Sequence, residues 1–139
     1  MTRVPDGLDK RSAGALGLAG TAAHDSVNAV DQQQGETILI SGATGGVGAL
    51  AVQLAASRGA RIIATARPGT EADFVAGLTD AEIDVVDYSG DLEAQVRAIA
   101  PGELTRYCTW PVTATSSPAC YGPAGASPPP SSSSPKAAM

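Results

Sequence analysis

The chain is poor in aromatic and charged residues, and several patterns that define common enzyme classes are absent from it. Aromatic residues make up 4% and charged residues 17% of the 139 residues, and His24 is the only histidine. No Gly-x-Ser-x-Gly motif is present, which argues against a hydrolase of the nucleophile-elbow type, and no Lys-Ser or Lys-Thr pair follows a glycine-rich loop as in a P-loop. Cys108 and Cys120 lie without Cys-x-x-Cys spacing. The sequence therefore predicts neither a zinc site nor a disulfide.

Basic residues are too few for a nucleic-acid-binding surface. Nine Lys and Arg residues face fourteen Asp and Glu residues, so the net charge is −5 at pH 7. No apolar run approaches the ~20 residues that a membrane span requires, and the N-terminal segment MTRVPDGLDK lacks the apolar core of a signal peptide. We expect a cytoplasmic protein without nucleic-acid or membrane partners.

The composition changes after residue 100. Eight of the ten prolines, both cysteines and the only tryptophan lie beyond that point. We predict three regions, which are a helical lead-in over 1–36, a folded core over 37–102 and a low-complexity tail over 103–139.

Strand-like and helical patterns alternate within the core. Short β-branched and apolar runs are typical of buried parallel strands, and they occur at 37–41, 61–66 and 83–88. Apolar residues at helical spacing occur at 47–58, 71–78 and 91–100. This order predicts an α/β fold, a partial Rossmann-type doubly wound parallel sheet of about three strands. Upstream, residues 9–30 are expected to be helical in two pieces interrupted by glycines.

A glycine-rich turn joins the first strand of the core to its first helix. Gly42, Gly45 and Gly48 follow Gly-x-x-Gly-x-x-Gly spacing, and Gly46 is an additional glycine. Glycines at such a turn let the chain leave the strand sharply, let backbone N–H groups approach a pyrophosphate and let the helix pack close to the sheet. The helix N-terminus adds unpaired N–H donors and the positive end of the helix dipole. We predict a dinucleotide site here, and a tight turn without a ligand is the alternative.

The end of the second strand favours NADP(H) over NAD(H). An acid near this point would bind the ribose 2′-hydroxyl of NAD. The segment from the end of the strand to Glu71 contains no acid before Glu71 itself. Arg67 follows the strand instead, and a guanidinium suits a 2′-phosphate. The alternative is that Arg67 is a solvated loop residue before Pro68.

Three segments resemble the nucleotide-binding domain of the medium-chain dehydrogenase/reductases, in their zinc-independent, quinone-oxidoreductase-like branch. They are LGLAGTAAHDSV, QQQGETILISGATGGVGALAVQLAASRGARIIATAR and VVDY, and the resemblance covers about residues 4–102. It implies an oxidoreductase that transfers hydride from NADPH to a quinone or an enone-type acceptor, with a small-molecule substrate and no metal.

The resemblance also implies cofactor contacts. Gly45, Gly46 and Val47 would face the pyrophosphate, Thr65 and Arg67 the adenosine ribose and its 2′-phosphate, Tyr88 the adenine side, and Thr21 the nicotinamide end. The predicted cofactor site is completed by the other residues of the turn, which are Gly42, Ala43, Thr44 and Gly48. No catalytic residue is predicted.

Two parts of the family pattern have no counterpart in this sequence. They are the family's separate β-rich substrate domain and the second half of its sheet. We therefore expect a truncated fragment of low activity, which a separate substrate domain or a larger modular synthase would complete; its oligomeric state is not predicted. Two alternatives stay open: a short-chain or NmrA-like NAD(P)-binding reductase or sensor, whose opening turn can also be GATGGVG, and a non-catalytic truncated gene product.

Two hypotheses explain the tail over 103–139. Its Ser-, Pro- and Ala-rich composition buries too little apolar surface to offset the entropy of ordering, which predicts a natural disordered segment. The other hypothesis is that the tail is the family's next segment translated in a shifted frame. When two bases are skipped in GC-rich codons for ELTRYCTWPVTATSSPACYGPAG, one permitted translation is ADAVLHLAGDGDELARLLRPGG. In that translation the pattern of a buried strand precedes the pattern of an amphipathic helix. Sequencing the encoding DNA across the codons for Ala100 to Arg106 distinguishes the two.

Overall fold

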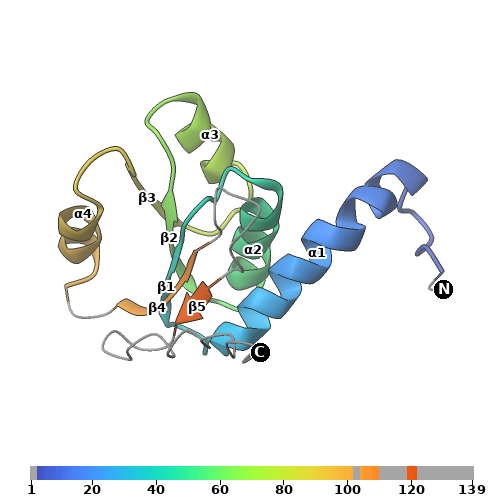
Figure 1. Cartoon of the computed structure of the whole chain (residues 1–139), viewed down its shortest axis with the longest axis horizontal. Helices are drawn as coiled ribbons and strands as arrows, with labels where there is room; N and C mark the ends of the chain where they lie inside the picture. Colours follow the sequence, from blue (N-terminus) through green and yellow to red (C-terminus); the bar gives the residue numbers. More distant parts are fainter. Residues whose placement is uncertain (1–2, 102–103, 110–118, 122–139) are drawn as a thin grey trace, which may run out of the picture.

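The computed structural model describes residues 3–101, 104–109 and 119–121, which form an α/β fold around one five-stranded sheet (Figure 1). Along the chain the elements are α1 (Lys10–Val30), β1 (Thr37–Ile40), α2 (Gly46–Ser57), β2 (Arg61–Thr65), α3 (Thr70–Ala76), β3 (Ile83–Val86), α4 (Leu92–Ile99), β4 (Leu104–Thr109) and β5 (Ala119–Tyr121).

The strands lie in the order β3-β2-β1-β4-β5. β2 pairs in parallel with both β1 and β3, so the predicted α/β class with three parallel strands is confirmed. β4 pairs in parallel with the other edge of β1, and β5 is antiparallel to β4. Both added strands fall within 103–139, where we predicted none. The remaining predictions for the tail concern residues 110–118 and 122–139, which lie outside the described residues.

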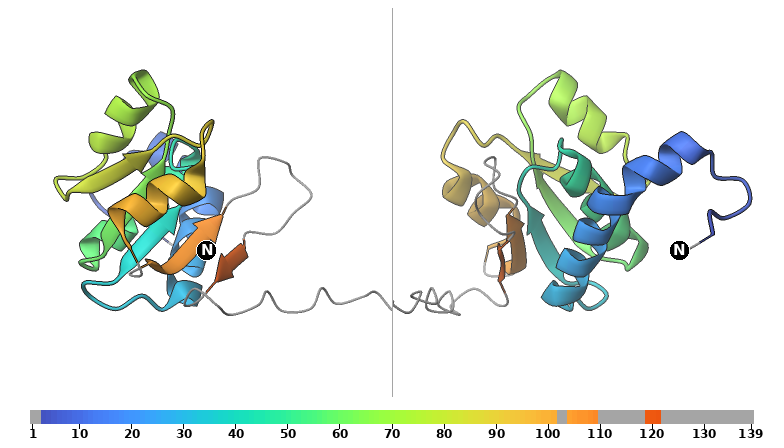
Figure 2. Two further views of the ribbon diagram at one scale, coloured as in Figure 1. Left: turned by 90° about the vertical axis from the view of Figure 1, so that its left-hand side faces the viewer. Right: turned by 45° about the vertical axis from the view of Figure 1, so that its right-hand side comes forward.

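Helices cover both faces of the sheet, as two views of the ribbon show (Figure 2). Side chains alternate along β2, so Ile62 and Ala64 join a core with α1, α2 and α3, whereas Ile63 packs toward α4. β1 follows the same alternation, with Ile38 in the first core and Leu39 in the second. The fully buried β-branched residues predicted from the strand pattern therefore form the centre of the molecule.

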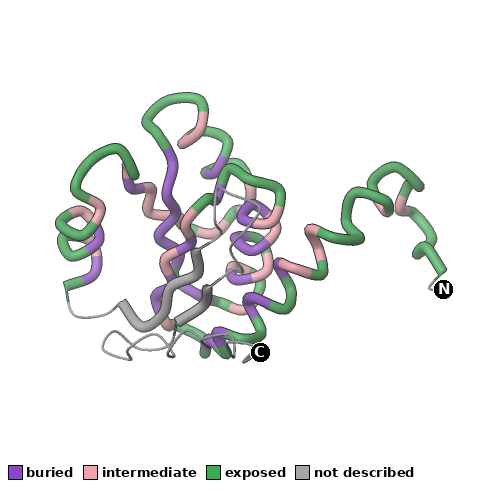
Figure 3. Tube along the Cα trace, viewed as in Figure 1, coloured by how far each residue is buried: buried purple, intermediate pink, exposed green. Residues whose placement is uncertain are grey.

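The lead-in is one continuous helix and not two pieces. The Asp9 side chain caps the start of α1 by accepting from the N–H groups of Arg11 and Ser12, and the helix ends at Asp31, whose φ is 49°. Its C-terminal part is buried through Val27 and Val30. This packing and the cap outweigh the cost of interior glycines, which is about 1 kcal/mol each relative to alanine. The N-terminal half of α1 extends away from the sheet and is largely exposed (Figure 3).

Within the described part of the chain, no helix has both the length and the apolar character that crossing a membrane would need.

Candidate cofactor-binding site

The glycine turn lies at the point where the order of the sheet reverses. β1 has β2 on one side and β4 on the other, and the turn follows the carboxyl end of β1. In doubly wound sheets, ligands bind in the crevice outside the carboxyl ends of the strands at this switch point. The topology therefore places the predicted dinucleotide turn where such a fold binds ligands.

Hydrogen bonds donated by backbone N–H groups fix the conformation of the turn. Gly42 has a φ of +72°, a conformation that side chains disfavour, and its N–H donates to the Thr65 hydroxyl oxygen at 3.0 Å. The N–H of Gly45 donates back to the Gly42 carbonyl oxygen at 3.0 Å. Thr65 is only 2% exposed. The end of β2 thus fixes the start of the turn.

Gly48 lets the first turn of α2 approach the glycine turn closely. A Cβ atom built on Gly48 would lie 2.1 Å from the Gly42 carbonyl oxygen and 2.9 Å from the Cα of Ala43. These contacts are too short for any other residue without a backbone shift. The close approach at this glycine is therefore between the helix and the turn, whereas the sequence predicted close packing of the helix on the sheet.

The N-terminal end of α2 presents free donors on an open surface. Gly45 caps the helix without a side-chain hydrogen bond, and the first bond of the helix runs from the Ala49 N–H to the Gly45 carbonyl oxygen. Among the described residues, the N–H groups of Gly46 and Val47 donate no hydrogen bond. A Cβ on Gly46 would meet no atom within 4 Å. These donors and the positive end of the helix dipole can bind a phosphate group that comes close to the backbone.

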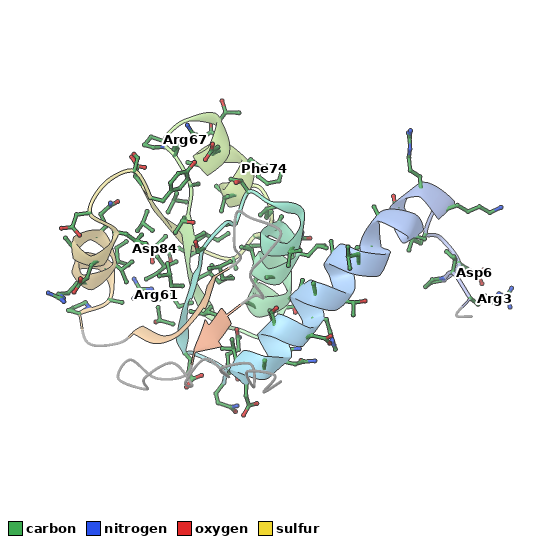
Figure 4. All side chains as sticks on the ribbon, viewed as in Figure 1. Arg3, Asp6, Arg61, Arg67, Phe74 and Asp84 are labelled. Atoms are coloured by element: carbon green, nitrogen blue, oxygen red, sulfur yellow. The ribbon has the colours of Figure 1, made fainter. Side chains whose placement is uncertain are left out.

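A second polar cluster lies at the carboxyl ends of β2 and β3. Glu71, in the first turn of α3, accepts hydrogen bonds from the backbone N–H of Arg67 at 3.0 Å and from its Nε at 3.1 Å. The Tyr88 hydroxyl donates to the same carboxylate at 3.4 Å, and the guanidinium carbon lies 5.6 Å from the centre of the Tyr88 ring. Figure 4 shows Arg67 near α3. The Arg67 side chain is 62% exposed, so it remains accessible to a ligand.

Both charges of this cluster persist at neutral pH. The backbone N–H of Arg67 bonds the Glu71 carboxylate and lowers the pKa of Glu71 from its usual value, and the positive charge of the guanidinium adds to this effect. The carboxylate in turn raises the pKa of Arg67. Ser89 lowers the pKa of the nearby Asp87, because its hydroxyl and N–H bond the Asp87 carboxylate.

The structure brings together most of the residues that the sequence singled out. Ala43 is buried beneath the turn, and Thr44, Gly45 and Gly46 are exposed on it. Arg67 and Tyr88 meet at the ends of their strands. Thr21 is exposed on α1, and its hydroxyl donates to the Gly17 carbonyl oxygen at 2.7 Å, which is a contact within its own helix.

Sequence reasoning missed the part that Glu71 plays. Glu71 was noted only as an acid too far along the chain to follow the strand directly. Its spacing of four residues from Arg67 is only a weak signal, because that spacing brings two side chains together on a helix and Arg67 precedes α3.

The described residues contain no group of three or more His, Cys, Asp or Glu side chains placed to bind a metal ion.

No protein-family model matches the chain. The chain is 40% identical over 85 residues to "Erythronolide synthase EryA2" of Saccharopolyspora erythraea. The matched residues make up 60% of this chain and 2% of the synthase. A quinone oxidoreductase of Pseudomonas syringae superposes with a TM-score of 0.62 at 31% identity, over 70% of this chain and 30% of the other. A mycobacterial protein in complex with NADPH superposes with a TM-score of 0.63 at 29% identity. This superposition covers 70% of this chain and 30% of the mycobacterial chain. The chain thus spans a small part of each of these relatives.

Proposed function

Since the chain is a relative of the quinone-oxidoreductase-like medium-chain dehydrogenase/reductases, we propose that it forms the NADP(H)-binding part of an oxidoreductase. The observation that supports this most directly is the open N-terminal end of α2, where exposed glycines leave backbone N–H groups free for phosphate. The NADPH complex of the mycobacterial relative is consistent with the same class of ligand.

The residues at the site fit the two charged parts of NADPH. Gly45, Gly46 and Val47 would hold the pyrophosphate, because the N–H groups of Gly46 and Val47 are free and no atom lies within 4 Å of a Cβ built on Gly46. Arg67 would pair with the 2′-phosphate and Tyr88 would lie by the adenine. Thr21 is proposed to lie toward the nicotinamide end.

When bound, NADPH supplies a hydride, and we propose a quinone as the acceptor. A second candidate class of acceptor is an enone-type C=C bond, which the resemblance to the family implies equally. The chain spans about 30% of the solved relatives, so the acceptor site and the substrate domain that would complete it belong to this proposal. Steady oxidation of NADPH with a quinone but not with an enoyl thioester would favour the first class, and the reverse result would favour the second.

Calorimetric titration of the full chain with NADPH tests the cofactor site. Gly46→Asp places a negative charge among the free amides, and we expect it to weaken binding at least ~10-fold because a like charge opposes the pyrophosphate. Gly14→Asp is the matched control, since Gly14 is also a helical glycine with no atom within 4 Å of an added Cβ and lies on the projecting half of α1.

Binding that is unchanged in Gly46→Asp, or a parent chain that binds neither NADPH nor NADH, would overturn the proposed function. Equal losses in both variants would also count against it, because the effect would then not depend on the glycine turn.

A further inference from the structure

A fixed negative charge lies where the proposed site needs to bind a phosphate. Glu71 bonds both the backbone N–H and the Nε of Arg67, and the Tyr88 hydroxyl bonds Glu71 as well. The carboxylate therefore contacts Arg67, which would pair with the 2′-phosphate of NADPH, and Tyr88, which would lie by the adenine. A site built only for that phosphate gains nothing from a carboxylate at this position.

We propose that Glu71 is a specificity-determining residue that reduces the preference of this site for NADPH over NADH. This inference rests on the proposed function and concerns the same site. The Glu71 carboxylate competes with the 2′-phosphate for the guanidinium of Arg67, and it repels that phosphate. A ribose 2′-hydroxyl has no charge and can donate a hydrogen bond to the same carboxylate.

The geometry supports competition more than simple orientation of Arg67. Glu71 uses the Nε of the guanidinium, one of the donors with which arginine makes paired bonds to a phosphate. The Arg67 side chain is 62% exposed and the Glu71 side chain 31% exposed, so solvent reaches both charges. Solvent screens the repulsion at such a site, and we expect it to change the affinity ratio about three- to tenfold.

Glu71→Gln separates this effect from a structural one. The amide keeps the size of the side chain and an oxygen that can accept from the Arg67 N–H, but it removes the charge. Glu93→Gln is the matched control, because Glu93 forms the same kind of exposed pair with Arg97 four residues away, on α4.

The measurement is calorimetric binding to the full chain of 2′,5′-ADP, 5′-AMP, NADPH and NADH, which requires no turnover. Glu71→Gln should raise the affinity of 2′,5′-ADP relative to 5′-AMP, and of NADPH relative to NADH, about three- to tenfold. Glu93→Gln should leave both ratios unchanged. Glu71→Ala, which also removes the bond to the Arg67 N–H, should raise the ratios in the same direction.

The outcomes separate this inference from the function on which it rests. Unchanged ratios in Glu71→Gln, with binding retained, would overturn the specificity role and leave the proposed function intact. Lower ratios would also overturn it, since Glu71 would then position Arg67 for the phosphate. If none of the four ligands binds the parent chain, the proposed function fails and this inference with it.

Discussion

The substitution Gly48→Ala, which adds a methyl group, tests whether close packing of α2 shapes the glycine turn. The added Cβ would lie 2.1 Å from the Gly42 carbonyl oxygen, 2.7 Å from its carbonyl carbon and 2.9 Å from the Cα of Ala43. All three are backbone atoms, so no rotamer change relieves the contact and the backbone must move by about 1 Å. Overpacking costs about 1–3 kcal/mol, against a gain in helix propensity of up to about 1 kcal/mol for alanine. We expect Gly48→Ala to lower the free energy of unfolding by about 1–2 kcal/mol.

Thermal unfolding of the full chain measures this loss. For a folded region of about 100 residues, a change of this size lowers Tm by about 10 °C. Gly46→Ala is the control, because its Cβ meets no atom within 4 Å and alanine is the better helix former. It should melt at or above the parent temperature. Equal melting of Gly48→Ala and the parent, or equal losses in the two variants, would refute the packing argument.

Two substitutions and one titration test the polar contacts around the site. Thr65→Val removes the acceptor for the Gly42 N–H and should cost about 1–3 kcal/mol, with faster amide exchange at Gly42 by NMR; unchanged exchange would contradict it. Arg67→Gln should weaken NADPH binding about tenfold or more with little effect on NADH, by calorimetry; equal losses would exclude a 2′-phosphate contact. The Glu71 carboxyl should titrate below the usual glutamate pKa by NMR, so its stabilising contacts are complete above the unfolded-state pKa and are lost as the pH falls through the lower folded-state pKa; a midpoint that is not lowered would refute this.

Elements with a strong local pattern were predicted well from the sequence. The three parallel strands were predicted from short β-branched and apolar runs. Such runs mark strands that are buried on both faces, as Ile62 and Ile63 show. The continuity of α1 was not, because local propensity counts its glycines against a helix while the burial of Val27 and Val30 depends on α2. β4 was missed for a similar reason. Its pairing with β1 involves residues far away in the sequence, and the Pro- and Ser-rich segment that follows dominated its local composition.

The candidate site divides in the same way. The glycine turn was predictable because each glycine meets a local requirement, such as the positive φ of Gly42 and the close approach at Gly48. The contact between Glu71 and Tyr88 depends on two strands ending side by side and on α3 starting at Thr70. No local pattern specifies that contact.

Thr65 makes the two halves of the site depend on each other. Its buried hydroxyl accepts from the Gly42 N–H, which fixes the turn before the free amides of α2. Two residues later, Arg67 begins the cluster with Glu71 at the end of the same strand. A shift of β2 by one residue along β1 would exchange its two faces, so it would remove the threonine from the turn and move the arginine away from Tyr88. The spacing between the free amides of α2 and the Arg67 guanidinium is therefore set by the register of β1 and β2, which the buried isoleucines on both strands hold in place.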